Sequence, residues 1–215
     1  EWAIERKSVT HIHETITALR NYWLVNNCHE ARPMADAAVQ VLEEAGVAHP
    51  LYAVTILRLG ALQVWTHYFR GQNSAGFTKS EALLNAYTVD DDPEAYIYIL
   101  IAMGVYLAKR FCIDEAIEVL TRSYELAEQY RAPNLQADAS YTLGSILDNN
   151  KRSKDAKAWM MRGLNMIKGS KSRYLQLVTY QQQLVLYMLQ WRLDDAIACY
   201  EGYQAMVTTL TWYHH

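Results

Sequence analysis

The stretch of the chain that decides the fold runs from residue 143 to residue 163 and reads LGSILDNNKRSKDAKAWMMRG. Within it, small Gly144 is followed 12 positions later by Ala156, and then by bulky Met160 and small Gly163. The same columns recur 40 residues earlier and 40 residues later, as Gly104, Gly144 and Leu184; Ala116, Ala156 and Ala196; Leu120, Met160 and Tyr200; and Ser123, Gly163 and Tyr203. Self-similarity at one period of this length is typical of stacked helical repeats.

Helical spacing of apolar residues dominates the rest of the chain, which predicts an all-α fold. Small residues in the columns allow the two helices of a unit to approach closely, and the bulky residue four positions on faces the next unit. Proline favours the first turn of a helix, so we expect helices to open at Pro33, Pro50, Pro93 and Pro133. Asp92 stands directly before Pro93 and is expected to cap that helix.

The order of small and bulky residues in 143–163 resembles the tetratricopeptide repeat (TPR). The copy around Gly104 matches almost as well, whereas the copy around Leu184 lacks the small residue. The resemblance implies a right-handed α-solenoid of about five antiparallel helix pairs, forming a single domain over residues 1–215. We expect the repeats at about 8–46, 50–88, 93–131, 133–169 and 173–211. The period of 40 exceeds the usual 34 of the family and is similar to the longer repeats of MalT-type regulators, peptide-sensing regulators and vesicle-fusion adaptors.

The two earliest pairs match the pattern less well. We expect the first pair at Val9–Asn26 and Pro33–Ala45. For the second pair, Leu59-Gly60 suggests a first helix from about Pro50 to Phe69, with a partner that begins near Thr78 and carries Ala82. The polar residues 70–76 between them are expected to form a long loop.

In the TPR family the first helices of successive repeats line a concave groove that holds an extended peptide or a helix. The resemblance therefore implies a groove lined by Tyr98, Ile101, Val105, Lys109, Asp138, Tyr141, Ser145, Asp148, Asn149, Val178, Gln181, Val185 and Met188. Family members that clamp a chaperone carboxylate place Lys where this chain has Ile101, Tyr141 and Gln181, so that clamp is absent. The aromatic, apolar and amide-rich lining suits a partly apolar peptide or helix. Ordinary packing between helices is the alternative role for each residue.

The charge is unevenly distributed along the chain. The net charge is −3 overall, yet residues 146–173 hold eight Lys and Arg against two Asp and Glu. We call seven of these the basic patch: Lys151, Arg152, Lys154, Lys157, Lys168, Lys171 and Arg173. The patch is either a solvated outer surface or a docking site for an acidic peptide or domain. Few aromatic residues accompany it, so we do not expect nucleic acid to bind this domain.

The sequence offers little support for chemistry or for a membrane. His11 and His13 are two residues apart and Cys28-His29 stands alone, which is unlike the spacing of metal ligands on helices. No phosphate-binding loop or nucleophile motif is present, so we expect neither catalytic residues nor a cofactor. Three distant cysteines, the lack of a signal peptide and the lack of a long apolar run lead us to expect a cytoplasmic protein without a membrane partner.

These observations predict a non-catalytic scaffold domain that binds a protein or peptide as a regulatory or assembly module of a larger protein. One alternative is the ligand- or peptide-sensing domain of a signal-responsive transcription regulator. The other is a self-associating structural module. The chain begins at Glu1, and residues 206–213 lack the polar outer face of a terminal solenoid helix. We therefore expect either a longer parent protein or a homodimer through the C-terminal helix.

Overall fold

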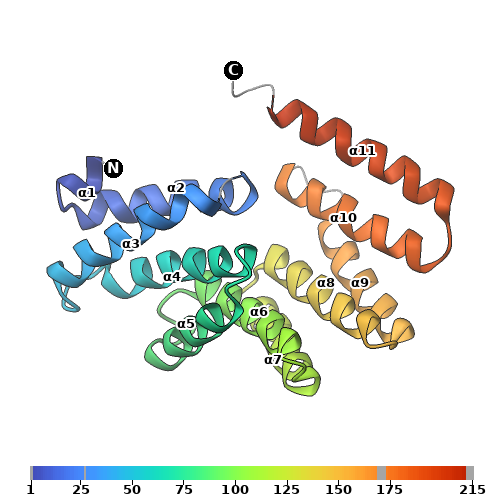
Figure 1. The fold of residues 1–215 in the computed structure, drawn as a ribbon, viewed down its shortest axis with the longest axis horizontal. Helices are drawn as coiled ribbons and strands as arrows, with labels where there is room; N and C mark the ends of the chain where they lie inside the picture. The colour runs from blue at the N-terminus through green and yellow to red at the C-terminus, as the bar shows by residue number, and fades with distance from the viewer. Residues whose placement is uncertain (1, 27, 169–172, 212–215) are drawn as a thin grey trace. The chain divides into compact units, whose positions relative to one another are not determined.

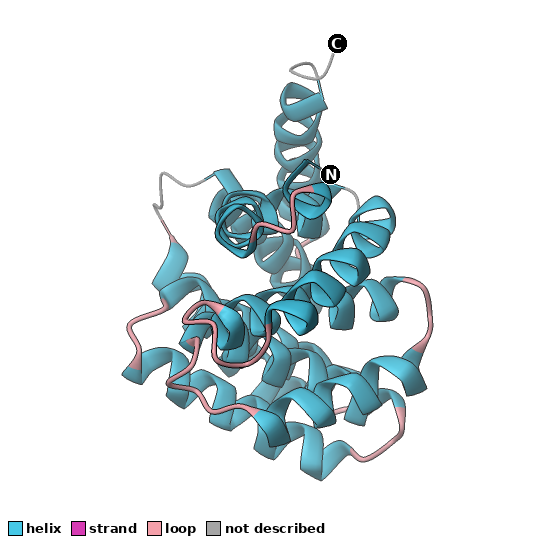
Figure 2. Cartoon of the chain, turned by 90° about the vertical axis from the view of Figure 1, so that its left-hand side faces the viewer, coloured by secondary structure: helices cyan, strands magenta, loops and turns pink. Residues whose placement is uncertain are grey.

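The structure is a computed structural model that describes residues 2–26, 28–168 and 173–211. These residues contain helices and connecting loops only (Figure 2), which confirms the predicted all-α fold. The helices are α1 (Trp2–Glu5), α2 (Val9–Asn26), α3 (Cys28–Ala45), α4 (Tyr52–Phe69), α5 (Asn73–Ala86), α6 (Pro93–Lys109), α7 (Ile113–Gln129), α8 (Pro133–Asn149), α9 (Ser153–Ile167), α10 (Arg173–Leu189) and α11 (Leu193–Thr211).

The chain forms two compact units, residues 1–119 and 120–215, with the boundary inside α7. In the first unit, α1 lies on α2 and α3, α4 packs against α2, α3, α5 and α6, and α5 also contacts α6. In the second unit, neighbours along the chain pack in sequence: α8 on α9, α9 on α10 and α10 on α11 (Figure 1). The single domain expected over residues 1–215 stays a prediction.

Four consecutive helix pairs share one 40-residue register. Their first helices end at Phe69, Lys109, Asn149 and Leu189, and their second helices begin at Asn73, Ile113, Ser153 and Leu193. The period that the sequence shows over three copies is therefore confirmed, and it extends one pair further toward the N-terminus.

The turn inside each of these four pairs has the same geometry. Its central residue adopts a positive φ, which is 70° at Gly71, 63° at Phe111, 62° at Lys151 and 58° at Trp191. In the third of these turns, Lys151 N donates to Asp148 O and Arg152 N donates to Leu147 O, each at 2.9 Å. The other three turns repeat this pair of bonds, which defines the Schellman motif at a helix C-terminus. Only one of the four positions is glycine, so composition gives no sign of the turn.

The second helix pair differs from the prediction. Residues 73–76 were expected in a long loop, but they form the first turn of α5, since the turn at Gly71 ends α4 and the next helix starts two residues later. In the shared register Val64, not Gly60, occupies the column of Gly104 and Gly144, and Gly76 occupies the column of Ala116 and Ala156. A Cβ atom at Gly76 would collide with the Tyr106 ring. The Tyr106 hydroxyl donates to Val64 O at 2.5 Å, so Gly76 makes room for a buried tyrosine.

The prolines divide into two groups. Pro93 and Pro133 open α6 and α8, as predicted, and the Asp92 side chain caps α6 by accepting from Ala95 N at 3.1 Å. Pro50 precedes the start of α4 by two residues. The prediction for Pro33 was wrong, because α3 begins five residues earlier and includes this proline.

The small residues that recur every 40 positions lie at the contact between the two helices of a pair. Ala156 and Met160 are fully buried, and a Cβ atom at Gly144 would lie 2.6 Å from Met160 Cγ and 3.0 Å from Ala156 O. This contact confirms the predicted role of Gly144. In the fifth repeat Ala196 is buried in the same way, but the Tyr200 side chain is 46% exposed.

We predict that Gly144→Leu lowers the free energy of unfolding, because a larger side chain must displace Met160 and push α8 away from α9. Overpacking of this kind costs about 1–3 kcal/mol. Urea denaturation of the variant provides the measurement, and Ala158→Leu on the exposed side of α9 is the control. Equal stabilities of Gly144→Leu and the unmodified chain would contradict the packing described here.

We also predict that Phe111→Gly is more stable than Phe111→Ala by about 1 kcal/mol, because a Cβ atom disfavours positive φ. Both substitutions remove a side chain that is 89% exposed, so the difference between them isolates the backbone effect. Thermal unfolding of the two variants provides the comparison. A more stable alanine variant would show that the turn does not hold this conformation in solution.

Candidate functional site

In the first unit, the predicted groove residues lie on α6 beside an aromatic cluster from α4. Tyr98 and Val105 are half-buried and Lys109 is exposed. The Tyr98 ring lies 5.1 Å from the Trp65 ring, measured between centroids. Ile101 is only 1% exposed, so its side chain fills the interior and the prediction that it lines a groove was wrong.

The shared register assigns α4 residues to the same columns. Arg58, Trp65 and Phe69 lie 40 positions before Tyr98, Val105 and Lys109. Sequence reasoning missed these residues because it aligned the second pair on Gly60. The 40-residue spacing between the ends of the first helices could have revealed them. That spacing is set by turns whose central residues have no common residue type.

The aromatic cluster consists of Trp65, Tyr68, Phe69 and Tyr98. Trp65 contacts Tyr68 at 5.6 Å and Phe69 at 6.2 Å between ring centroids, and Phe69 is 52% exposed. The Trp65 indole N–H is buried and has no hydrogen-bond partner among the described residues. A buried donor of this kind is costly unless an acceptor reaches it. The cluster therefore combines an exposed ring with an unused donor.

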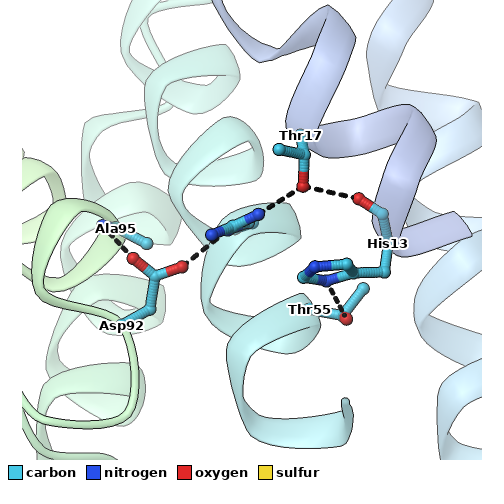
Figure 3. A network of polar contacts seen from close by, with 6 residues as sticks. His13, Thr17, Thr55, Asp92 and Ala95 are labelled. Carbon is cyan, nitrogen blue, oxygen red and sulfur yellow. Dashed lines mark hydrogen bonds and ion pairs between the residues drawn. The ribbon is translucent and has the colours of Figure 1, made fainter. Parts of the chain in front are cut away.

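Arg58, at the other end of α4, is already paired. Its Nε atom donates to Asp92 Oδ2 at 2.6 Å, and its guanidinium also donates to Thr17 Oγ1 on α2 (Figure 3). Asp92 is 4% exposed and caps α6 with its other oxygen. Because this network ties α2, α4 and the start of α6 together, Arg58 has a structural role and its charge is already balanced.

His13 belongs to the same network. Its Nδ1 atom lies 3.0 Å from Thr55 Oγ1, and Figure 3 shows the imidazole ring and the Thr55 hydroxyl facing each other. Burial lowers the pKa of His13 below its ordinary value of 6.5, and the positive charge of Arg58 lowers it further. Protonation of His13 therefore opposes folding.

In the second unit, the predicted groove residues on α8 are mostly half-buried. Asp138, Tyr141, Ser145 and Asp148 are half-buried and Asn149 is exposed. Burial raises the pKa of Tyr141, although a hydrogen bond with Ser145 acts in the opposite direction. Asp148 accepts from the Ser153 hydroxyl at 2.8 Å. Tyr141 also packs against the core cluster of Met160, Leu164 and Leu186, so part of this surface serves helix packing.

The predicted residues on α10 differ from one another in exposure. Gln181 is exposed, Met188 is 58% exposed, and half-buried Val185 packs against Met160 and Leu186. Val178 lies in α10, but its side chain is outside the part that the structure describes. The neighbouring Gln182 is fully buried and donates to Ala137 O at 3.4 Å, so it holds α10 to α8 and does not face a ligand.

The basic patch is a solvated surface of α9 and its flanking turn. Lys151, Arg152, Lys154, Lys157 and Lys168 are all exposed. Arg152 pairs with Asp155 at 3.0 Å, whereas the four lysines form no ion pair with any residue that the structure describes. Lys171 and the side chain of Arg173 lie outside the described residues.

The described residues contain neither a cluster of metal ligands nor a helix suited to a membrane. No three His, Cys, Asp or Glu side chains gather there in a way that could hold a metal ion. None of the described helices has the length and apolar character needed to span a membrane.

No protein-family model matches the chain, and no curated protein is significantly similar to it in sequence. Among solved structures, the crystal structure of BtubC (BKLC) from P. vanneervenii is similar, with a TM-score of 0.56 and 12% identity over 99% of this chain and 94% of that chain. A structure described as MamA MSR-1 C2 matches 89% of this chain and 98% of its own length, with a TM-score of 0.40 and 16% identity. The likeness to BtubC, together with the four helix pairs in one register, shows a TPR-like helical-repeat fold.

We predict that the free energy of unfolding falls as the pH is lowered below 6.5, because the unfolded chain then takes up a proton on His13 that the folded chain resists. The loss develops between the pKa of His13 in the unfolded chain and its lower pKa in the folded chain. Urea denaturation at about pH 7.5 and about pH 5.5 measures it. His13→Gln should make the loss smaller. His11 is exposed, and His11→Gln is the control, which should lose as much unfolding free energy as the unmodified chain. An equal loss in the unmodified chain and both variants would exclude His13 as the cause.

Proposed function

We propose that this chain is a TPR-like scaffold that binds a segment of another protein through the exposed side of its first helices. The observation that carries the proposal is the aromatic cluster of α4 and α6, where Phe69 is 52% exposed beside the rings of Trp65 and Tyr68. A scaffold role also agrees with the fold, whose helices are positioned by packing between neighbours.

The chemistry of this cluster favours an extended peptide or a helix with an apolar or aromatic side chain. An exposed ring such as Phe69 gains contact area when another ring or an aliphatic chain packs on it. The half-buried Trp65 ring lies beside Phe69 and adds apolar contact area to the same surface. Because Asp92 balances the charge of Arg58, the cluster does not depend on an acidic ligand.

The basic patch supports a separate contact with an acidic segment in the second unit. Four exposed lysines on and beside α9 form no ion pair with any residue that the structure describes, so an acidic partner gains attraction without breaking such pairs. We infer that the scaffold serves a regulatory or assembly role in a larger complex. Its long repeat, similar to that of MalT-type and peptide-sensing regulators, makes peptide sensing the second hypothesis.

The experiment is affinity capture from a cell lysate with the full chain as bait, beside two variants that each remove one exposed phenylalanine. Phe69→Ala removes the ring of the aromatic cluster, and Phe111→Ala is the control because its ring is 89% exposed and lies outside the cluster. We expect the first variant to retain about ten-fold less of at least one protein, as for an anchor residue of an interface. The control should retain it fully.

The capture also separates the two surfaces. Lys151→Glu with Lys154→Glu reverses two charges of the basic patch and should weaken only partners that are bound through it. If Phe69→Ala and Phe111→Ala capture the same proteins in the same amounts, the aromatic cluster is not a binding surface. A synthetic peptide from the captured protein that raises the melting temperature of the unmodified chain, but not of Phe69→Ala, would confirm direct binding.

A further inference from the structure

The outer side of α11 carries three exposed apolar residues in one line. Leu193, Ile197 and Tyr200 are 59%, 58% and 46% exposed, and their spacing of four and three residues places them on one face of the helix. We call these residues the α11 stripe. In Figure 1, α11 lies along α10, which has α9 on its other side.

The repeat register shows what this face does in the preceding second helices. The residues equivalent to Tyr200 are Leu120 and Met160, and both are fully buried. Met160 forms one core cluster with Leu164 of α9 and Leu186 of α10, and Val185 and Leu189 pack against this cluster. The face that Tyr200 exposes is therefore the face on which another helix packs in the repeat before it.

The residue types of α11 also suit a covered helix. Its stripe is Leu, Ile and Tyr, and the equivalent residues of α7 are Ile113, Ile117 and Leu120, which are half-buried or buried. A helix with a solvated face would carry polar side chains there, as α9 does at Lys157. Exposed apolar residues at positions that are half-buried or buried in α7 indicate an interface.

Charge identifies the occupant. α11 contains no Lys or Arg between Leu193 and Thr211, and exposed Asp194 and Glu201 flank the stripe. A contact between two α11 helices would bring like charges together. A suitable surface must instead be basic with some apolar area, and α9 of this same chain provides one. Lys154 and Lys157 lie on one exposed face of α9 together with Met161, which is 39% exposed, and exposed Lys168 follows the last residue of the helix.

We propose that the α11 stripe of one copy docks on this basic face of α9 in a second copy of the chain. Leu193, Ile197 and Tyr200 cover Met161 and the aliphatic stems of the lysines, while Asp194 and Glu201 face the lysine charges. Because every copy carries both surfaces in the same unit, two copies can close a symmetric pair with two such contacts. This self-association is independent of ligand binding at the aromatic cluster.

Sedimentation equilibrium of the full chain at roughly 2–200 µM tests the proposal, since this range covers weak association. At about 50 mM salt we expect the mass to rise from 24.8 kDa toward twice that value, and at about 500 mM salt we expect a smaller rise because the charges are screened. A mass of 24.8 kDa over the whole range at low salt would overturn the proposal.

Matched variants locate the interface. Ile197→Glu with Tyr200→Glu should keep the chain monomeric, whereas Ala198→Glu, exposed on another side of the same helix, should not. Circular dichroism confirms that each variant is folded, and Ile197→Ser is the milder substitute if the double variant is not. Dimerisation that survives the stripe variants would overturn the proposal.

A charge swap tests whether α9 is the opposing surface. Lys157→Glu with Lys168→Glu should weaken association at least about ten-fold, because two of the three attracting charges become repelling. Mixing this protein with a second one that carries Asp194→Lys and Glu201→Lys should restore association between the two. Without that rescue, the occupant of the α11 stripe is not α9 of a second copy.

Discussion

The close approach of two helices at Gly144 is the contact on which the repeat depends. A Cβ atom at Gly144 would lie 2.6 Å from Met160 Cγ and 3.0 Å from Ala156 O. The helices α8 and α9 therefore lie closer at this point than a larger residue would allow. The turn at Lys151 fixes how α9 leaves α8, because its two backbone bonds close the end of the first helix in one geometry. Close packing and a fixed turn together define a unit that can be repeated, since each determines where the next helix begins.

Different pairs satisfy the same close approach with different residues. In the second pair Gly76 makes room for the Tyr106 ring, whose hydroxyl reaches Val64 O, while Val64 itself stands where the next two repeats have Gly104 and Gly144. The requirement is for volume at the contact and not for glycine at a fixed position. When one helix has a small residue, a larger residue of a neighbouring helix can fill the space that this leaves. The packing therefore remains dense although the residue at a given repeat position changes.

This exchange explains which parts of the fold the sequence could predict. The third and fourth pairs were predicted well because their columns keep small residues at Gly104, Gly144, Ala116 and Ala156, and the fifth pair retains Ala196. The second pair was misaligned because Gly60 is a more conspicuous small residue than the correct Val64, and because the turn at residue 71 resembles those at Phe111 and Trp191 in backbone conformation and hydrogen bonds but not in residue type. Backbone conformation at a non-glycine residue leaves no trace in composition. The same misalignment hid Trp65 and Phe69 from the candidate site.

Exposed columns carry the differences between the repeats, because packing does not constrain them. α7 and α9 share the buried positions Ala116/Ala156 and Leu120/Met160, yet α9 carries Lys157 where α7 has Ile117 and α11 has Ile197. A mutation at such a position changes what the surface attracts without disturbing the contact between the helices of the pair. Residues that depart from the repeat while exposed are therefore more informative about binding than residues that conform to it. Phe69, Lys157 and Tyr200 are of this kind, since each lies in a column whose other members differ in size, charge or burial.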